Sequence, residues 1–375
     1  MHRRVGLLLF AAGWGANHFS TLLVVYRREL GLSPSALGIL FGAYALGLVP
    51  GLILAGRASD RWGRRALVIP ASLVALVASG VVSFGGTHGF SVLMAGRLLY
   101  GLGMGSAMSP GSVWLQELSP AGTGARRATL ALSAGFGLGP LVAGVLAEFA
   151  PAPMVLPYIV HIVVMTAALL GTRAVPETAI GARGGAAART RWRDLAVLVE
   201  LLPVAPWAFG LAAATMVVLP GLLRSMVARP VLYSGTIILA TLGAGVLVQP
   251  YVKRVGRHAD LLGLAVGALG VWLGARVVAS GSPPLALLAA PLAGLGYGLA
   301  MTSGLAEVAA RVPAQARGTA VGIYYVLTYV GFSVPFVHAT VAKRWGDVPT
   351  LEVTAAAVLV SLVARALTKL RRPAA

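Results

Sequence analysis

One carboxylate lies among four arginines in the polar stretch GRASDRWGRR, residues 56–65, which separates two long apolar runs. Asp60 is that carboxylate. It can pair with a neighbouring guanidinium or lie against a helix N-terminus, while Gly56 and Gly63 permit sharp backbone turns. So many charges are too costly to place in hydrocarbon. The stretch therefore predicts a short, tightly built polar loop between two membrane helices.

The order of residues in this loop is Gly, three residues, Asp, Arg, any residue, Gly, Arg, Arg. It resembles the signature loop of the major facilitator superfamily of transporters, although Ala58 and Ser59 replace the usual leucine and alanine. The resemblance implies an alternating-access transporter in which this loop latches one conformation. A loop that only orients the chain by its positive charge needs no aspartate at that spacing. The residues expected to form the conformational latch are Gly56, Asp60, Arg61, Gly63 and Arg64.

The first apolar run, residues 5–26, carries Asn17 and His18 near its middle. Histidine titrates near neutral pH, so His18 is a candidate proton carrier or substrate contact. A neutral histidine that is hydrogen-bonded across helices fits the sequence equally well. His161, in the run 154–171, has the same two interpretations, and for it the structural one is favoured.

Arg97 lies within the apolar run 90–114. An arginine there normally faces the bundle interior or a wet cavity, and the alternative is that its side chain snorkels to the interface. The stretch LMAGRLLYGLGMG resembles the fourth-helix motif of the superfamily, in which an arginine is followed four residues later by glycine. Tyr100 stands where that family usually has glutamine. The resemblance implies a role for Arg97 and Tyr100 in substrate binding or proton coupling.

Glycines and a proline recur in the run 128–149. Small residues let membrane helices approach closely, and proline bends a helix. The run SAGFGLGPLVAG is similar to the fifth-helix motif of proton-coupled exporters, which favours export over uptake. The motif residues are Gly135, Gly139, Pro140 and Gly144.

The acidic residues all fall in predicted loops or near the ends of apolar runs, so a buried organic cation would find no carboxylate at mid-membrane. Hydroxyl, amide and aromatic groups suit a neutral or anionic amphiphile better. No phosphate-binding loop with lysine and no cluster with metal-ligand spacing occurs in the sequence, so we expect neither an enzyme, nor a cofactor, nor a metal site. The candidates to line a cavity are Tyr44, Tyr233, Gln249, Tyr297 and Tyr324.

Composition places the chain in the membrane. Of its 375 residues, 58% are hydrophobic and only 11% are charged, which nearly excludes a soluble domain. The net charge of +19 comes from cations in short loops, without a basic face interleaved with aromatics, so membrane lipids rather than nucleic acid are the expected partner. There is no cysteine, and lysine occurs only three times, which favours a GC-rich bacterial genome.

Twelve runs are long enough to span a bilayer, for which about 20 mostly apolar residues suffice. Alternate loops and the two termini together hold 22 of the 30 lysines and arginines, while the opposite loops hold six, which predicts that both termini are cytoplasmic. We expect an all-α membrane protein with the major facilitator fold: a six-helix half at 1–171, a cytoplasmic linker at 172–195 and a second six-helix half at 196–375. The linker segment ARTRWRDL is either an interfacial helix or flexible. The predicted spans are 5–26, 36–56, 66–84, 90–114, 128–149, 154–171, 196–223, 231–252, 261–280, 284–306, 319–342 and 350–367.

An internal repeat supports the two halves. At one offset of 193 residues, Gly101, Gly103 and Gly105 fall on glycines 294, 296 and 298, and Arg64 falls on Arg257. Such a duplication predicts a site between the halves near mid-membrane.

These features together predict a secondary active transporter in the bacterial plasma membrane, acting as a proton-coupled exporter (antiporter) of an amphipathic small molecule or drug. We expect the small-molecule substrate, protons and lipids as its partners, and a monomeric chain. An uptake permease or symporter is the alternative, because fold does not fix direction. A non-transporting scaffold or sensor is the interpretation from a different class.

Overall fold

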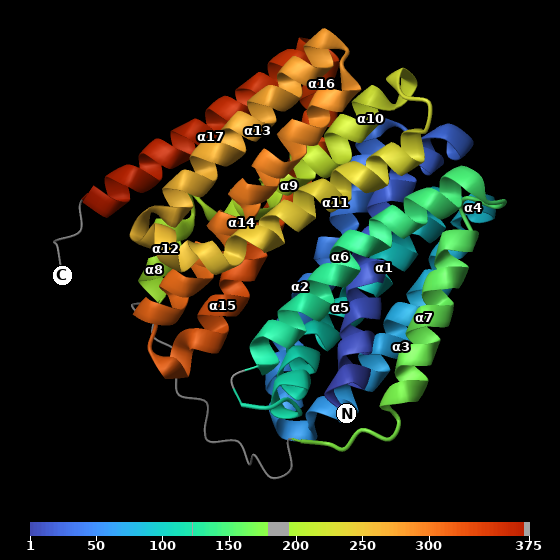
Figure 1. Cartoon of the computed structure of the whole chain (residues 1–375), viewed down its shortest axis with the longest axis vertical. Coiled ribbons are helices and arrows are strands. Elements are labelled where there is room, and N and C mark those ends of the chain that lie inside the picture. Colours follow the sequence, from blue (N-terminus) through green and yellow to red (C-terminus); the bar gives the residue numbers. More distant parts are fainter. Residues whose placement is uncertain (122, 179–194, 371–375) are drawn as a thin grey trace. The chain divides into compact units, whose positions relative to one another are not determined.

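The computed structural model describes residues 1–121, 123–178 and 195–370 (Figure 1), with side chains described except at 54, 56, 57, 60, 125 and 314–319. Within these ranges the chain is helical and contains no strand. It divides into two compact units. Unit 1 comprises the described residues up to 178 together with 231–239, and unit 2 comprises residues 195–230 and 240–370.

Unit 1 is a bundle in which α6 packs along α1, while α2 and α3 both pack along α5. Helix α7 lies against α1 and α3. The bounds are α1 His2–Leu30, α2 Pro34–Trp62, α3 Arg64–Ser83, α4 Gly85–His88, α5 Phe90–Glu117, α6 Gly124–Phe149 and α7 Leu156–Thr172.

Local sequence signals set the first helix boundary. Helix α1 ends at Gly31, which adopts a left-handed conformation with φ of 63°. Helix α2 begins with Pro34 at its first position, and the Ser33 hydroxyl accepts a hydrogen bond from the backbone nitrogen of Ala36 at 3.2 Å.

Unit 2 repeats the packing of three helices seen in unit 1, with α13 and the main part of α11 both packed against α14. Helix α17 lies against α13. The longer elements are α8 Ala196–Leu201, α9 Ala205–Ala213, a π-helical turn Ala214–Val218, α10 Leu219–Leu223, α11 Pro230–Val248, α12 Val252–Val255, α13 Ala259–Ser280, α14 Ala286–Arg311, α15 Ala314–Tyr329, the 3-10 turn η7 Val330–Ser333, α16 Val334–Trp345 and α17 Asp347–Leu370.

The described helices account for twelve membrane crossings. Nine stretches are long and apolar enough to span a bilayer, and one of these, Pro230–Ser280, contains both α11 and α13. The 28-residue α5 and the 17-residue α7 supply the remaining two. The predicted all-α fold is therefore confirmed, and the twelve-helix count is consistent with the structure.

The repeated glycines make the same contacts in each unit. In unit 1, a Cβ on Gly101 would overlap the carbonyl oxygen of Tyr44, and one on Gly105 would overlap that of Leu48. Backbone atoms of α5 and α2 thus meet directly, which only glycine permits.

In unit 2, Gly294 and Gly298 on α14 have the same relationship to the carbonyl oxygens of Thr241 and Gly245 on α11. The third glycine of each set faces the next helix along, so that α5 meets α3 and α14 meets α13. The glycines repeated in the sequence therefore support the same helix packing in both units.

The predicted loop at 56–65 is shorter than expected. Helix α2 continues through Gly56 to Trp62, and α3 begins at Arg64, so a single residue makes the turn. That residue is Gly63, with φ of 106°. Gly56 forms no turn because the i to i−4 hydrogen bonds of an apolar helix tolerate an isolated glycine.

Candidate functional site

A carboxylate from the segment after α7 caps the start of α3. Glu177 accepts hydrogen bonds from the backbone nitrogens of Arg64 at 2.8 Å, Arg65 at 2.9 Å and Ala66 at 3.3 Å. The free N–H groups and the helix dipole favour negative charge there. Gly63 makes room, since a Cβ on it would overlap this carboxylate.

The same segment also contacts α5. The indole nitrogen of Trp114 donates to the carbonyl of Pro176 at 3.0 Å, and the Arg65 guanidinium donates to the carbonyl of Arg173 at 2.8 Å. The hydroxyl of Thr178 donates to the Glu117 carboxylate. The end of α7 is thereby tied to α3 and α5.

The predicted latch residues are only partly brought to this turn. Arg61 is exposed on the last turn of α2, while the guanidinium of Arg64 donates to the Ser59 hydroxyl at 2.8 Å and lies 3.5 Å from the Glu117 carboxylate. The side chain of Asp60 lies outside the described residues, as does the linker segment predicted as an interfacial helix. The latch therefore stays a prediction.

Arg97 on α5 lies inside the bundle of unit 1, with 2% of the residue exposed. Its guanidinium carbon is 4.3 Å from the ring centre of Phe19 and 4.8 Å from that of Tyr44. It donates to three backbone carbonyls at 3.3 to 3.4 Å. The side chain thus does not snorkel to the surface. The three carbonyls belong to Ala16, Leu40 and Phe41.

Carbonyl dipoles and ring faces are the contacts that stabilise this charge. None of the ion pairs among the described side chains involves Arg97. Burying a cation without a counter-ion is expensive, so an anionic or strongly polar acceptor would be favoured here.

His18 on α1 has one satisfied and one unsatisfied ring nitrogen. Its Nδ1 lies 3.2 Å from the carbonyl oxygen of Trp14, while Nε2 is buried without a partner. The ring packs edge-on against Tyr158, with centroids 4.7 Å apart, and the hydroxyl of Tyr158 shares a 2.6 Å hydrogen bond with that of Tyr26. The neighbouring Asn17 is half-buried.

His161 on α7 is satisfied at both nitrogens. Its Nε2 lies 3.0 Å from the carbonyl oxygen of Ala11 and its Nδ1 lies 3.0 Å from the hydroxyl of Ser79 on α3. Its ring centre is 5.2 Å from that of His18, and Tyr100 donates to a carbonyl of α1 beside it. The structure thus joins His18, Arg97 and Tyr100 in one buried polar cluster and adds His161.

The small residues of α6 form a seam with α1. A Cβ on Gly135 would lie 2.7 Å from the backbone nitrogen of Trp14, and one on Gly139 would lie 2.9 Å from its Cα. The Thr21 hydroxyl donates to the carbonyl of Pro140 at 3.0 Å. The predicted fifth-helix motif therefore packs mainly within unit 1.

The end of the same helix meets the start of α11, which belongs to unit 1. A Cβ on Gly144 would lie 3.0 Å from the carbonyl oxygen of Val231. The Glu148 carboxylate accepts hydrogen bonds from the backbone nitrogens of Val231 at 2.8 Å and Leu232 at 3.1 Å. A carboxylate again caps a helix N-terminus.

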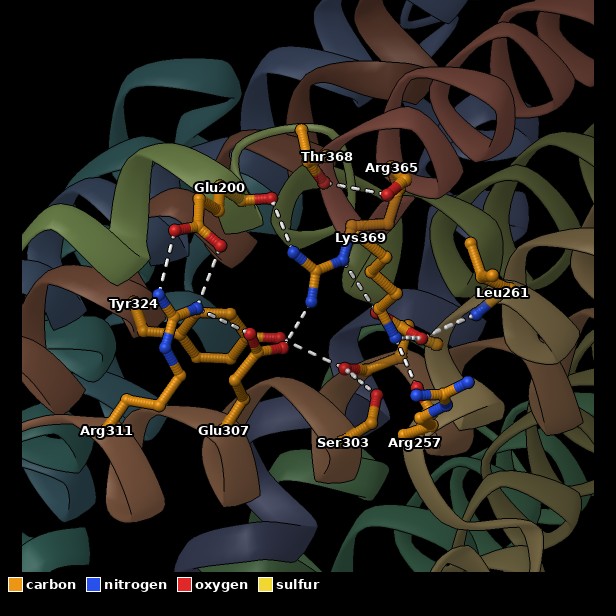
Figure 2. Close-up of polar contacts among 12 residues, drawn as sticks. Glu200, Arg257, Leu261, Ser303, Glu307, Arg311, Tyr324, Arg365, Thr368 and Lys369 are labelled. Carbon is orange, nitrogen blue, oxygen red and sulfur yellow. Dashed lines mark hydrogen bonds and ion pairs between the residues drawn. The ribbon is translucent and has the colours of Figure 1, made fainter. Parts of the chain in front are cut away.

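Unit 2 contains an ionic cluster around a buried arginine that the sequence did not predict (Figure 2). Arg365 on α17 is fully buried; its Nε lies 2.7 Å from the carboxylate of Asp260 on α13, and Nη2 pairs with Glu307 on α14. Its third nitrogen donates to the backbone carbonyl of Glu200 on α8 at 3.0 Å. One guanidinium thus joins four helices.

Two further cations complete the cluster. Arg311 binds both carboxylate oxygens of Glu200 and one of Glu307, each at 2.8 Å, and Lys369 lies 2.5 Å from Asp260 (Figure 2). Such bidentate pairs fix geometry as well as charge. The cluster could not be recognised in the sequence, because each member looks like an isolated charge near the end of an apolar run.

Part of this cluster has a counterpart in unit 1, where a carboxylate takes the place of a lysine. Glu177, after the sixth helix of its half, binds the start of α3; Lys369, near the end of the twelfth crossing, binds Asp260 in the first turn of α13. The separation between Glu177 and Lys369 is close to the repeat offset. The nearly equivalent positions of Glu177 and Lys369 in the repeat were therefore the sequence feature that could have indicated this contact.

Three of the proposed cavity aromatics have contrasting places. Tyr297 on α14 stacks on Phe209, with centroids 5.7 Å apart, and Phe209 stacks on Tyr329 at 4.8 Å. Tyr44 faces Arg97. Tyr324 instead is fully buried, and its hydroxyl donates to a carbonyl of α14 at 3.1 Å, so it joins two helices rather than lining a cavity.

The remaining two candidates, Tyr233 and Gln249, are half-buried on and just after α11. Within the described ranges, no three histidine, aspartate or glutamate side chains are close enough to share a metal ion.

A model of the Major Facilitator Superfamily matches residues 5–336 of this chain. The chain belongs to the major facilitator superfamily. It is therefore a multi-pass membrane protein of a transporter family rather than an enzyme. The predicted family is confirmed.

Relatives within the superfamily differ in what they are named for. The quinolone resistance protein NorA of Staphylococcus aureus (strain Mu50 / ATCC 700699) is 30% identical over 38% of this chain and 39% of its own length. Polyol transporter 5 of Arabidopsis thaliana is 31% identical over 29% of this chain and 20% of its own. The chain thus matches less than half the length of either relative.

Solved structures of major facilitator proteins share the fold at low sequence identity. The nucleoside transporter NupG has a TM-score of 0.77 with 14% identity and covers 99% of each chain. A D-xylose-proton symporter has a TM-score of 0.75 with 16% identity, covering 97% of this chain and 96% of its own.

Proposed function

We propose that this protein is a proton-coupled exporter of an amphipathic small molecule in the bacterial plasma membrane. The observation that carries the proposal is the buried cluster of unit 1, where Arg97 has two aromatic faces and three carbonyl partners but no ion-pair partner among the described side chains. A group of this kind binds the polar end of a ligand, and the rings beside it bind an apolar part.

The substrate is proposed to be neutral or anionic. Arg97 would receive an acceptor group, such as a carboxylate, while the free Nε2 of His18 would receive a hydrogen-bond donor. An organic cation would be repelled by the guanidinium and would find no carboxylate in these contacts. The other proposed ligand contacts in unit 1 are Asn17, Tyr44 and Tyr100.

Export is supported by the seam that α6 forms with α1, which carries the motif residues of proton-coupled exporters. Close backbone contact at Gly135 and Gly139 lets the two helices move as one rigid piece. The partial match to NorA, which is named for quinolone resistance, supports the same direction.

The conformational cycle is proposed to be rocking of the two six-helix halves, with the turn at Gly63 as the latch. Glu177 holds the start of α3, so that Asp60, Arg61 and Arg64 would be presented from a rigid end of unit 1. We infer that this end and both termini are cytoplasmic, as the distribution of lysine and arginine indicates, and that the chain acts as a monomer.

Proton-coupled uptake is the second candidate. A proton and a substrate anion bound in one cluster would attract each other, which favours moving both in the same direction. The shared fold with a D-xylose-proton symporter is compatible with this direction.

Accumulation of nalidixic acid tests both candidates. This quinolone carries a carboxylate and no aliphatic amine, and its uptake would be measured in bacteria that lack their major efflux pumps, with and without the protein. We expect lower accumulation that returns to baseline when the proton gradient is collapsed. Higher accumulation would establish uptake instead, and ethidium, a permanent cation, should be unaffected.

Two arginine variants make the experiment specific. Arg97→Gln should abolish the difference, and Arg97→Lys should restore only part of it, because lysine lacks the planar guanidinium. Arg276→Gln is the matched control, since this second arginine within an apolar run is exposed and paired with Glu352 at 3.1 Å. Equal effects of Arg97→Gln and Arg276→Gln on accumulation would show that Arg97 does not bind the ligand. Asp60→Asn would test the latch in the same assay.

A further inference from the structure

Two buried histidines of unit 1 differ in how their ring nitrogens are satisfied. His161 on α7 has a partner at each nitrogen, whereas His18 on α1 has one at Nδ1 only. We propose that His161 is the proton-binding residue of the transport cycle and that Ser79 on α3 is the hydroxyl that adapts to its protonation. The inference rests on the proposed proton coupling, yet proton binding can be measured without any transport.

The Nε2 of His161 carries a hydrogen in every state. Its nearest partner is the carbonyl oxygen of Ala11 at 3.0 Å, and a carbonyl can only accept; the Tyr100 hydroxyl, 3.5 Å away, donates to the carbonyl of Ala12. In the neutral ring the remaining nitrogen, Nδ1, is therefore a bare acceptor. Its single partner is the Ser79 hydroxyl at 3.0 Å, which then has to donate to it.

The Ser79 hydroxyl has a second possible acceptor. Its oxygen also lies 3.2 Å from the carbonyl oxygen of Ala75, one turn earlier on α3. When a proton from water binds the lone pair of Nδ1, the new N–H donates to the Ser79 oxygen, and the Ser79 O–H rotates to the Ala75 carbonyl. The protonated ring then donates two N–H hydrogen bonds. Each donor in the series His161, Ser79 and Ala75 has an acceptor. Only one hydroxyl hydrogen has to rotate.

His18 has no such arrangement. Its Nδ1 lies against the carbonyl of Trp14 at 3.2 Å, so that nitrogen carries the hydrogen. A proton on Nε2 would then form a buried, charged N–H with no acceptor, which is costly. Nε2 is instead suited to accept a hydrogen bond from a bound molecule.

The surroundings of His161 include titratable groups from three helices. His18 on α1 has its ring centre 5.2 Å away, Tyr100 on α5 is 5.9 Å away by the same measure, and Tyr158 lies on α7 itself. Arg97 on α5 is the charged group of the cluster. Helices α3 and α6 contribute no titratable side chain to the contacts described for His161.

Stabilisation of the proton therefore comes from hydrogen bonds and not from an ion pair. A carboxylate partner would hold the proton strongly, whereas two neutral acceptors leave it free to be released. Reversible binding is what a coupling residue needs.

Nuclear magnetic resonance of the full chain in detergent micelles, with ¹⁵N-labelled histidine, tests proton binding directly. The chain has six histidines, and the signal of His161 is the one missing from the spectrum of His161→Gln. Glutamine is suitable because its amide can donate to Ala11 and accept from Ser79 but cannot bind a proton. We expect the His161 signal of the unsubstituted protein to titrate reversibly as the solution is acidified from about pH 8 to pH 4. It should do so equally in His18→Gln.

Ser79→Ala gives a second variant that separates this mechanism from simple burial. It removes the acceptor of the new N–H and also the donor to the neutral ring. Because the charge-assisted hydrogen bond is the stronger of the two, the ratio of protonated to neutral His161 at a given acidic pH should fall by about fivefold. A His161 signal that does not move over the whole range, or that moves identically in Ser79→Ala, would overturn the proposal.

Transport of nalidixic acid supplies the functional comparison. Loss of gradient dependence in His161→Gln, with retention in His88→Gln, where the replaced histidine is exposed, supports the coupling role. Retained gradient dependence in His161→Gln would refute that role while leaving the proposed export intact. Absence of transport by the unsubstituted protein would refute the proposed function, and the titration would still decide whether His161 binds a proton.

Discussion

The carboxylate of Glu177 lies 2.8 Å from the backbone nitrogen of Arg64, directly across the turn between α2 and α3. The next two backbone nitrogens of α3 donate to the same carboxylate. A segment that follows the sixth crossing thus completes the start of the third.

Removal of this cap should destabilise unit 1. Glu177→Ala leaves three N–H groups without their carboxylate, and we expect the free energy of unfolding to fall by about 1–2 kcal/mol. The midpoint temperature of the purified protein in detergent measures it. Glu29→Ala is the matched control, because Glu29 is exposed and pairs with the adjacent Arg28. Equal midpoints for the two variants would show that the cap contributes nothing.

The Gly63 turn should tolerate no side chain. Its φ of 106° is unfavourable for alanine, and a Cβ would overlap Glu177, so Gly63→Ala should lower the free energy of unfolding by about 1–3 kcal/mol. Gly80→Ala on α3 is the comparison, since a Cβ there would meet no atom within 4 Å. That variant should unfold at an unchanged or slightly higher temperature.

The ionic cluster of unit 2 should depend on each of its carboxylates. Asp260→Asn leaves the fully buried Arg365 with one carboxylate partner, Glu307, instead of two, and we expect a loss of about 1.5–3 kcal/mol. Glu352→Gln breaks the exposed pair with Arg276 and should cost less than about 1 kcal/mol. Thermal unfolding of the two variants side by side measures the difference. Similar midpoints would mean that the buried pair is no stronger than a surface one.

Apolar run length was sufficient to predict an all-α membrane protein, and glycine spacing indicated its duplication, because both reflect physical requirements that are local in sequence; the fold family was implied by the resemblance of the loop at 56–65. A run that must cross a bilayer has to be long and apolar, and the glycines at 101 and 294 are needed where two backbones touch. Helix ends were less predictable. Gly56 looked like a turn residue, yet an isolated glycine does not interrupt a helix, and the turn fell on Gly63.

Contacts between distant residues could not be predicted in the same way. Glu200, Asp260, Glu307 and Arg365 lie on four helices, and no spacing in the sequence joins them. His18 and Arg97 were recognisable singly, because polar groups in apolar runs are expensive. The partner that satisfies each nitrogen of His161 is set by packing alone, so its distinction from His18 required the structure.

The two halves should respond alike to substitution of their equivalent glycines. Gly101→Ala places a Cβ onto the carbonyl of Tyr44, and Gly294→Ala places one onto that of Thr241. Backbone cannot yield as a flexible side chain does, so the helices must separate, and we expect each variant to lose about 1–3 kcal/mol of unfolding free energy. Gly243→Ala on α11 is the control, since nothing lies within 4 Å of its Cβ position.

Thermal midpoints of the three variants in detergent test whether the equivalent glycines stabilise both halves. Comparable losses for Gly101→Ala and Gly294→Ala, with none for Gly243→Ala, would mean that one packing solution stabilises both halves. If only one of the two lowered the midpoint, the duplicated glycines would be a remnant of ancestry in the other half, and its helices would be held by other contacts. Where both single variants lose stability, the double variant should add the two losses, because the two sites lie in different units and share no contact partner.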